Sequence, residues 1–327
     1  MNKLVTIIIP TIGRGELLKA AILSAVSQTY KKIEIFVSDN NSNSNVEKII
    51  EDINDKRIRL VTRESRLDLA SHIRICYQEA LGEYIMILSD DDLISRDYIE
   101  GIVKVFDNDS SIGLGISSQV ILGPNDLELN EEGPRAKNSI IDGWIFLQKF
   151  ILGQIPISVY TFFSLFTRRD SLYLNDFYKE FWPGSNGSHV DNYLLFLIAI
   201  NSKVAITQGL FGYRVYPQSE GLTTRFIALT LATKRYGMEL SRLINLKTPF
   251  FSKKYFIYTE LLKYSLVDML FTRLNKYYRK RESFKNYVKY FLLVVYCYPV
   301  ISIYYILFSK SVKASSFMTK VRSYLLN

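Results

Sequence analysis

Short apolar runs alternate with amphipathic segments along the first 120 residues. Runs of β-branched and aliphatic residues that stop at turn clusters predict strands over residues 4–9, 33–38, 58–62 and 84–89. Between these runs, apolar residues recur every three or four positions, which predicts helices over residues 16–27, 46–53 and 68–81. This alternation predicts an α/β fold with a mostly parallel central sheet, flanked by helices on both faces.

Beyond residue 120 the pattern is less regular. The polar segment at residues 123–135 predicts a loop, and a glycine-containing segment at residues 182–188 predicts another. The apolar stretch at residues 193–200 predicts a buried helix, and residues 210–215 predict a strand. The α/β pattern therefore continues to about residue 215.

Charge is unevenly distributed along the 327 residues, whose net charge is +9. Residues 247–327 contain 15 Lys and Arg against three acidic residues, which leaves a net charge of −3 on the first 246 residues. A basic, aromatic C-terminal region is typical of proteins that contact anionic lipid or nucleic acid. We do not expect nucleic acid as a partner, because the region contains no recognisable reading motif.

Residues 290–308 form an uncharged stretch that is long enough to cross a bilayer. Pro299 interrupts the stretch, and its tyrosines favour the headgroup zone, so the sequence favours a helix that lies in the membrane interface. A spanning helix and an apolar helix buried in protein stay open as alternatives. Cys76 and Cys297 have no metal-ligand spacing and fit reduced packing residues of a cytosolic protein.

Three consecutive carboxylates, Asp90, Asp91 and Asp92, follow the apolar run at residues 84–89. Acids gathered at the end of a buried strand are costly unless a cation neutralises them. Mg²⁺ and Mn²⁺ commonly bind one or two carboxylates together with substrate phosphates, so these acids predict a metal–diphosphate site. The alternative is that Asp90 or Asp92 caps a helix that begins near Asp97, with all three acids solvated.

Three segments of the chain occur in the order and strand context of known motifs. They are VTIIIPT at residues 5–11, IFVSDNNS at residues 35–42 and ALGEYIMILSDDD at residues 80–92. Together they resemble the successive motifs of inverting family 2 glycosyltransferases, of the type that builds bacterial surface polysaccharides. The resemblance covers residues 3–215 and implies the GT-A fold, which is Rossmann-like. It also implies transfer of a sugar from a nucleotide-diphosphate-sugar donor to a glycan acceptor, lipid-linked in O-antigen or capsule synthesis.

The resemblance and the basic, aromatic C-terminal region together imply how the chain is divided. Residues 1–220 would form the glycosyltransferase domain, with a nucleotide-sugar-binding half at 1–120 and an acceptor half at 121–220. Residues 221–327 would form a helical, basic and aromatic extension that associates with an anionic membrane surface. We therefore expect a peripheral or monotopic protein on the cytoplasmic face of the bacterial inner membrane.

On the donor side, the resemblance implies that Pro10, Thr11 and Asp39 hold the nucleoside. Asp39 would accept hydrogen bonds from the base, which suits a carboxylate because it offers acceptors only. The alternative role of Asp39 is an Asx-turn at the end of a strand.

The acidic motif of the family is Leu-Asp-x-Asp-Asp, and this chain departs from it because Ser89 stands at the first acidic position. Asp91 and Asp92 match the last two positions and are the expected ligands of Mg²⁺ or Mn²⁺, with Asp91 as the leading ligand. Asp90 stands at the variable position, and we expect it on the donor side together with Asp91. The ion would stabilise the diphosphate leaving group as the glycosidic bond breaks.

An inverting transfer needs a general base on the face opposite the leaving group. The resemblance implies Asp191 for this role, and a simple helix cap is its alternative. Three further residues are expected on the acceptor side: Trp182 as a stacking surface or core residue, His189 as an assistant or structural residue, and Arg214 as a partner of phosphate or of an acid. Tyr216 replaces the histidine of the family's Tyr-Arg-x-His segment.

Two other functions stay open from the residues alone. A metal-dependent nucleotidyltransferase also pairs acids with a metal and a nucleotide, and Gly13-Arg14-Gly15 is a faint version of the phosphate loop that it needs. A non-catalytic scaffold that binds nucleotide sugars or glycans at the membrane would need no general base.

Overall fold

The computed structural model describes residues 3–122, 128–132, 139–151, 165–173 and 190–214. The chain divides into two units, Met1–Ser219 and Glu220–Asn327, and all described residues belong to the first. The expected membrane-associating extension, including residues 290–308, lies outside the described residues. Among the helices that are described, none combines the length and apolar composition needed to cross a bilayer.

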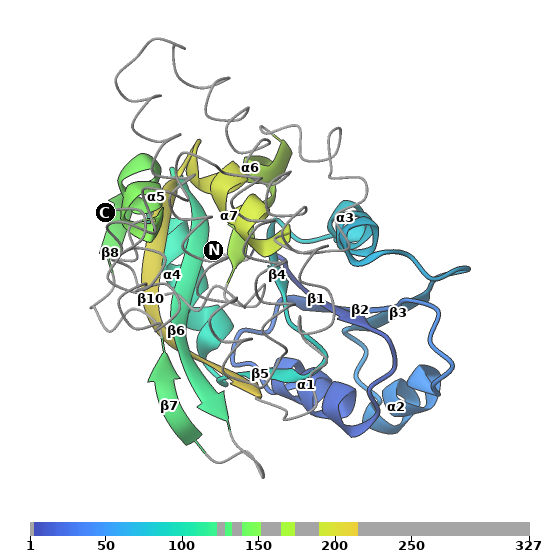
Figure 1. The fold of residues 1–327 in the computed structure, drawn as a ribbon. Helices are drawn as coiled ribbons and strands as arrows, with labels where there is room; N and C mark the ends of the chain where they lie inside the picture. The colour runs from blue at the N-terminus through green and yellow to red at the C-terminus, as the bar shows by residue number, and fades with distance from the viewer. Residues whose placement is uncertain (1–2, 123–127, 133–138, 152–164, 174–189, 215–327) are drawn as a thin grey trace, which may run out of the picture. The chain divides into compact units, whose positions relative to one another are not determined.

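The first half of the sheet consists of parallel strands that are joined by helices (Figure 1). In spatial order the strands are β3 (Ile58–Thr62), β2 (Ile33–Asp39), β1 (Val5–Thr11) and β4 (Tyr84–Ile87). The helices between them are α1 (Glu16–Val26), α2 (Val46–Ile53) and α3 (Leu69–Glu79). Figure 1 shows α1 and α2 on one face of these strands and α3 on the other. The predicted elements of this half are therefore confirmed, each with bounds within two residues of the expectation.

The second half extends the same sheet in the order β4-β9-β6-β10-β5, with β7 beside β6 and β8 beside β10. Its strands are β5 (Asp92–Ile94), β6 (Ile112–Leu122), β7 (Glu128–Glu132), β8 (Ser139–Asp142), β9 (Phe166–Arg168) and β10 (Lys203–Arg214). Its helices are α4 (Tyr98–Asn108), α5 (Gly143–Ile151), α6 (Arg169–Tyr173) and α7 (Val190–Ala199).

The prediction of a mostly parallel sheet is wrong for this second half, so the sheet as a whole is mixed. β6 and β10 are parallel, but β9 runs antiparallel to both β4 and β6. β5 and β8 run antiparallel to β10. Parallel pairing follows from strand–helix–strand crossovers, whereas the short strands β5 and β9 pair with strands that are distant in the sequence. No local hydrophobic pattern specifies such pairs.

The predicted loop at residues 123–135 contains a strand, β7, which pairs antiparallel with β6. Its sequence, ELNEE, has none of the apolar alternation that predicts a strand. Strands pair through backbone hydrogen bonds, so a polar segment can join the edge of a sheet. The strand predicted over residues 210–215 begins earlier, at Lys203, and the helix predicted over residues 193–200 begins at Val190.

An aromatic cluster joins the two halves of the sheet. Tyr84 of β4, Phe106 of α4 and Phe166 of β9 are fully buried, and their ring centroids lie 5.0 to 5.5 Å apart. Two of these pairs meet edge to face, an arrangement that aromatic quadrupoles favour. The cluster therefore anchors β9 against β4, the strand that leads into the three acids.

Candidate active site

The three acids lie in a turn, residues 89–92, which we call the acidic turn. Leu88 N donates to Ile8 O at 2.8 Å and so continues the pairing of β4 with β1. Asp92 N then donates to Ser89 O at 3.2 Å, which closes the turn, and Asp92 becomes the first residue of β5. All four residues of β4 are buried, so the predicted buried strand before the acids is confirmed.

The capping alternative for the acidic turn is wrong. Asp90 is 5% exposed and Asp92 is 2% exposed, so the three acids are not all solvated. Helix α4 begins at Tyr98, and its N-cap residue is Asp97. The reason is that residues 92–94 pair with β10 as a short strand, which separates the acids from the helix.

Asp90 joins the acidic turn to the end of β1. Thr11 Oγ1 donates to Asp90 Oδ2 at 2.7 Å, and Arg14 Nε lies 3.5 Å from Asp90 Oδ1. Burial raises the pKa of Asp90, while the Thr11 hydrogen bond and the Arg14 charge act in the opposite direction. Both carboxylate oxygens therefore contact protein groups, which gives Asp90 a role in fixing the turn.

Asp91 is more open than Asp90. Its side chain is 24% exposed, against 7% for that of Asp90. Ser89 Oγ donates to Asp91 Oδ1 at 2.6 Å, and Arg14 Nη1 donates to Asp91 Oδ2. Ser89, the departure from the family motif, thus orients the neighbouring carboxylate through its hydroxyl. Asp91 is held in one orientation while part of it faces solvent.

The donor set of the acidic turn fits a divalent cation. Carboxylate oxygens are hard ligands of the kind that Mg²⁺ and Mn²⁺ prefer, and a cation on Asp91 would have to compete with the Arg14 guanidinium that contacts Asp90 and Asp91. Within the described ranges, no three His, Cys, Asp or Glu side chains converge to form a complete metal cage. Mg²⁺ and Mn²⁺ commonly bind one or two protein carboxylates and take their remaining ligands from water and substrate phosphates.

The other expected donor-side residues lie beside the acidic turn. Pro10 and Thr11 end β1 and are in register with Ser38 and Asp39 at the end of β2. Asp39 is 3% exposed, and its Oδ1 accepts a hydrogen bond from Ser42 N at 3.0 Å. This contact is the one expected if Asp39 forms an Asx-turn at the end of its strand. It uses one of the two carboxylate oxygens.

The sequence did not single out Asn40, which ties the ends of three strands together. Asn40 N donates to Thr11 O at 2.9 Å. The side-chain amide donates to Leu67 O and accepts from Leu67 N, both at 2.9 Å. These hydrogen bonds therefore hold the segment that follows β3 against the ends of β1 and β2. An Asn directly after a buried strand was the only signal for this role.

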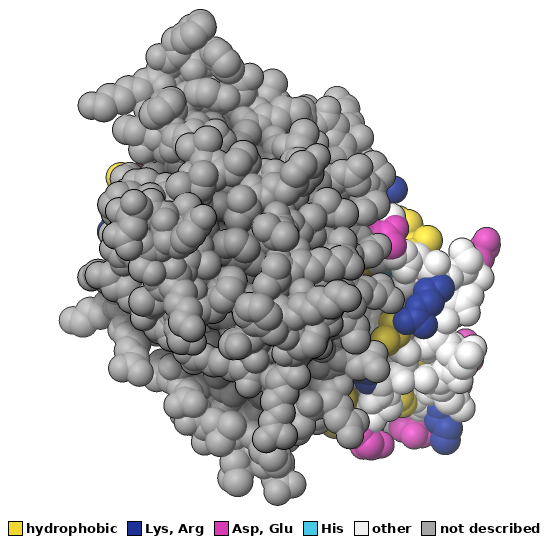
Figure 2. Space-filling view, viewed as in Figure 1, with side chains coloured by type: hydrophobic (Ala, Val, Ile, Leu, Met, Phe, Trp, Pro, Cys, Tyr) yellow, Lys and Arg dark blue, Asp and Glu magenta, His cyan; other side chains and the backbone are white. Residues whose placement is uncertain are grey.

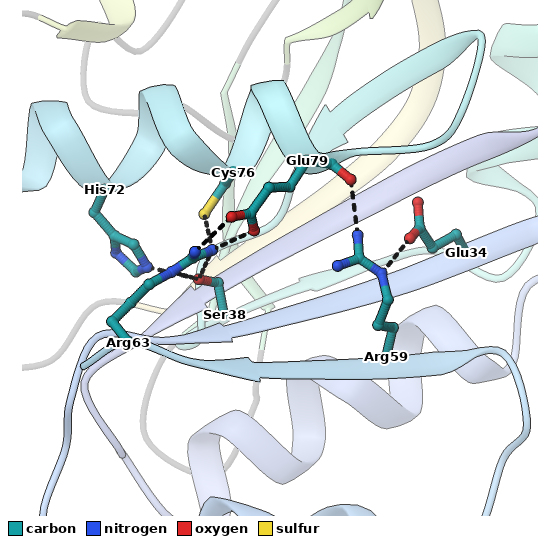
Figure 3. Close-up of polar contacts among 7 residues, drawn as sticks. All are labelled: Glu34, Ser38, Arg59, Arg63, His72, Cys76 and Glu79. Atoms are coloured by element: carbon teal, nitrogen blue, oxygen red, sulfur yellow. Dashed lines mark hydrogen bonds and ion pairs between the residues drawn. The ribbon is translucent and has the colours of Figure 1, made fainter.

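A polar network joins Ser38, the residue before Asp39, to side chains of α3 (Figure 3). Arg63 donates from Nε and Nη2 to Ser38 Oγ, at 3.1 and 2.9 Å, and forms two hydrogen bonds of 2.8 and 2.7 Å with Glu79. Ser38 Oγ lies 2.8 Å from His72 Nε2. Arg63 can only donate, whereas a hydroxyl and a neutral imidazole nitrogen can each donate or accept, so the direction of the Ser38–His72 hydrogen bond is set by the His72 tautomer. Burial lowers the pKa of His72 to about 4, and the Arg63 charge adds to this effect.

The structure describes the backbone of only two of the four residues expected on the acceptor side. Asp191 is the second residue of α7, and Arg214 is the last residue of β10, where Tyr213 pairs with Asp92 of β5. The side chains of Asp191 and Arg214 lie outside what the structure describes, as do Trp182 and His189 altogether. The roles of these four residues stay predictions.

The fold and site agree with one class of protein. A mixed α/β sheet in which Thr11, Asp39 and the acidic turn meet at the ends of β1, β2 and β4 is the arrangement of GT-A-like folds. A family model described as "Glycosyl transferase family 2" matches residues 6–172. The chain belongs to glycosyl transferase family 2.

The individual proteins that the chain resembles have low sequence identity to it. Glycosyltransferase GlyG of Streptococcus pneumoniae is 28% identical over 118 residues, 35% of this chain and 39% of that protein. The UDP-Glc:alpha-D-GlcNAc-diphosphoundecaprenol beta-1,3-glucosyltransferase WfgD of Escherichia coli is 27% identical over 133 residues, 36% of this chain and 53% of that protein. The crystal structure of S. aureus TarS 1-349 in complex with UDP-GlcNAc is 14% identical, with a TM-score of 0.55, and the match covers 82% of this chain and 71% of that one. The chain thus spans about half or less of the length of these two curated relatives, and the TarS likeness supports the fold alone.

Proposed function

We propose that this chain is a metal-dependent inverting glycosyltransferase. It would move a sugar from a nucleotide-diphosphate donor to a lipid-linked glycan acceptor in O-antigen or capsule synthesis. The main support is the acidic turn, which lies beside Thr11 and Asp39 at the carboxyl ends of parallel strands. Ligands of α/β sheets bind at this edge. Family membership favours sugar transfer over the nucleotidyl transfer that the acids alone leave open.

Each donor-side residue has a distinct task in this proposal. Asp39 binds the base through the carboxylate oxygen that Ser42 does not occupy, and Pro10 and Thr11 line the same strand end. Asp91, with Asp92, holds Mg²⁺ or Mn²⁺, which when bound neutralises charge on the diphosphate leaving group. Asp90 keeps the turn against Thr11. These residues orient the donor before any acceptor arrives.

On the acceptor side, Asp191 acts as the general base. It takes the proton from the attacking sugar hydroxyl, while the carbon–oxygen bond to the diphosphate breaks on the opposite face of the sugar. A single displacement of this kind inverts the anomeric configuration. Trp182, His189 and Arg214 complete the acceptor side.

The substrate classes are supported by relatives. The name of the E. coli relative describes transfer from UDP-Glc to GlcNAc-diphosphoundecaprenol, and the S. aureus structure is a complex with UDP-GlcNAc. We therefore propose a uridine diphosphate sugar as donor and a polyprenyl-diphosphate-linked glycan as acceptor. Residues 221–327 would hold the enzyme at the cytoplasmic face of the inner membrane, against anionic lipid.

The substitution Asp191→Asn tests whether the chain is an enzyme. A panel of nucleotide sugars is first screened by thermal shift with Mn²⁺, and the donor found is then used with a synthetic undecaprenyl-diphosphate GlcNAc acceptor. The variant should bind the donor as the wild type does and lose transfer by roughly a hundredfold or more. Asp170→Asn, which changes an exposed acid of α6, is the matched control and should transfer normally. A wild type that binds donor without any transfer would instead identify a scaffold.

A further inference from the structure

Arg14 lies in a loop whose backbone is unusual. Gly13 and Gly15, on either side of it, have φ angles of +83° and +58°, a region that side chains disfavour. Gly13 O accepts a hydrogen bond from Ser44 Oγ at 2.8 Å, and a Cβ at Gly13 would lie 2.2 Å from that oxygen. The turn after β2 therefore holds this loop closely. The loop is built so that Arg14 is presented at a fixed place between β1 and α1.

The Arg14 guanidinium lies across two carboxylates of the acidic turn. Its Nη1 donates to Asp91 Oδ2, and its Nε lies 3.5 Å from Asp90 Oδ1. The Arg14 side chain is 42% exposed, whereas that of Asp90 is 7% exposed. The Asp90 carboxylate is thus nearly buried, while the Arg14 side chain as a whole remains partly exposed to solvent. An arginine in this position can leave without unfolding the turn.

The charge balance of the turn changes when a cation binds. Without one, Arg14 is the positive group that offsets Asp90 and Asp91. A divalent ion on Asp91 would use the oxygen that Arg14 now contacts, and two positive groups a few ångströms apart repel each other. The diphosphate that arrives with the ion offers new acceptors, which a planar guanidinium can bind in a bidentate manner.

We propose that Arg14 is an exchangeable counter-ion of the acidic turn. It pairs with Asp91 while the site is free and transfers its guanidinium to the donor diphosphate when a divalent cation takes Asp91. The inference rests on the proposed function, because it requires both the cation and the diphosphate to bind here. It assigns Arg14 a diphosphate-binding role in addition to its contact with the acids.

This exchange predicts effects of opposite sign for one substitution. In Arg14→Gln, Mn²⁺ alone should bind about three- to tenfold more tightly than in the wild type, because no guanidinium competes for Asp91. With saturating Mn²⁺, UDP should bind about fivefold or more weakly, because a phosphate contact is lost. Mn²⁺ binding is measured by electron paramagnetic resonance, and UDP binding by calorimetry, on the full chain. Lys104→Gln, which removes an exposed charge paired with Glu100 on α4, is the control and should change neither.

A double-mutant cycle tests whether Arg14 and Mn²⁺ compete for Asp91. In an Asp91→Asn background, Arg14→Gln should no longer tighten any remaining Mn²⁺ binding, since the contested carboxylate oxygen is replaced by an amide nitrogen. Unchanged Mn²⁺ affinity in Arg14→Gln, or weaker binding of both Mn²⁺ and UDP, overturns the exchange. A wild type that binds neither Mn²⁺ nor UDP overturns the proposed function itself. The two failures are therefore distinguishable.

Discussion

In the proposed function, Asp39 combines two roles that the sequence presents as alternatives. One carboxylate oxygen accepts the Ser42 amide and fixes the turn after β2. In the proposed function the other oxygen binds the base. A carboxylate can do both because each oxygen has its own lone pairs. The local turn contact is therefore compatible with base recognition, and it orients the group for that task.

The adjacent acids of the turn differ because their surroundings differ. Asp90 is buried against Thr11, whereas the Asp91 side chain is partly exposed and is oriented by a hydrogen bond from Ser89. Ser89 removes the first acid of the family motif, but Asp90 adds an acid at the variable position, so the turn keeps three carboxylates. Arg14 offsets part of their negative charge. In the proposed function, this partly neutralised turn is where the cation binds.

His72 gives a pH-dependent prediction at the residue scale. Its pKa is lowered from 6.5 to about 4 by burial and by Arg63, with Glu79 acting in the opposite direction. The unfolded chain therefore binds a proton that folded His72 does not, and stability falls as the pH drops from 6.5 towards 4. At pH 5 this loss should be about 2 kcal/mol relative to pH 8.

The substitution His72→Gln isolates this effect, because the Gln side chain can donate to Ser38 Oγ or accept from it and does not titrate. The free energy of urea unfolding is measured for both proteins at pH 8 and pH 5. The difference between variant and wild type should shift by about 2 kcal/mol in favour of the variant at pH 5. An equal change in both proteins would show that His72 is not the group responsible.

At the scale of elements, the sequence predicts the first half of the fold well and the second half poorly. β1 to β4 are apolar runs bounded by turns, and the helices between them have clear periodicity, so local pattern is sufficient. β5 and β9 are three-residue strands, and β7 is polar. Their pairing depends on distant partners such as β10 and β6, which no local pattern reveals.

The site follows the same division. Thr11, Asp39 and the acidic turn end predicted strands, so their meeting at one edge follows from the parallel topology. Asn40 was missed as a site residue, and Arg14 was noted only within a faint phosphate-loop pattern, because their contacts with Leu67 and Asp91 join residues far apart in the sequence. The positions of residues that end strands can be predicted from the sequence. Residues that hold strand ends together through long-range hydrogen bonds are recognised only in the structure.

The aromatic cluster gives a prediction at this scale. Phe106 is fully buried against Tyr84 and Phe166, so Phe106→Ala should lower the free energy of unfolding by about 3–5 kcal/mol. Leu81→Ala, at a side chain that is 64% exposed, should change it by less than about 0.5 kcal/mol. Both are measured by urea unfolding. Equal losses in the two variants would contradict the role given to the cluster.

At the scale of the whole molecule, charge separates along the chain. The first 246 residues carry −3, whereas residues 247–327 carry +12. Figure 2 shows Lys and Arg interspersed with Asp and Glu on the described part of one face, without a single-sign patch there. The excess positive charge therefore belongs to the C-terminal region of the sequence, which is where we expect contact with anionic lipid.

Deletion of residues 290–327 tests the membrane role. The full chain should sediment with vesicles that contain anionic lipid, and the shortened chain should stay in the supernatant. Neutral vesicles and high salt serve as controls, because screening weakens electrostatic attraction to the headgroups. Continued sedimentation of the shortened chain with anionic vesicles would exclude this segment as the anchor.

The central claim is that the acidic turn holds a cation that binds the donor diphosphate, and calorimetry of UDP binding tests it most directly. The wild type should bind UDP at least about tenfold more tightly with Mn²⁺ than with a chelator, and Asp91→Ala should lose this difference. Asp52→Ala, at an exposed acid of α2, should retain it. If UDP binds the wild type and Asp91→Ala with the same affinity, with and without Mn²⁺, the account is contradicted.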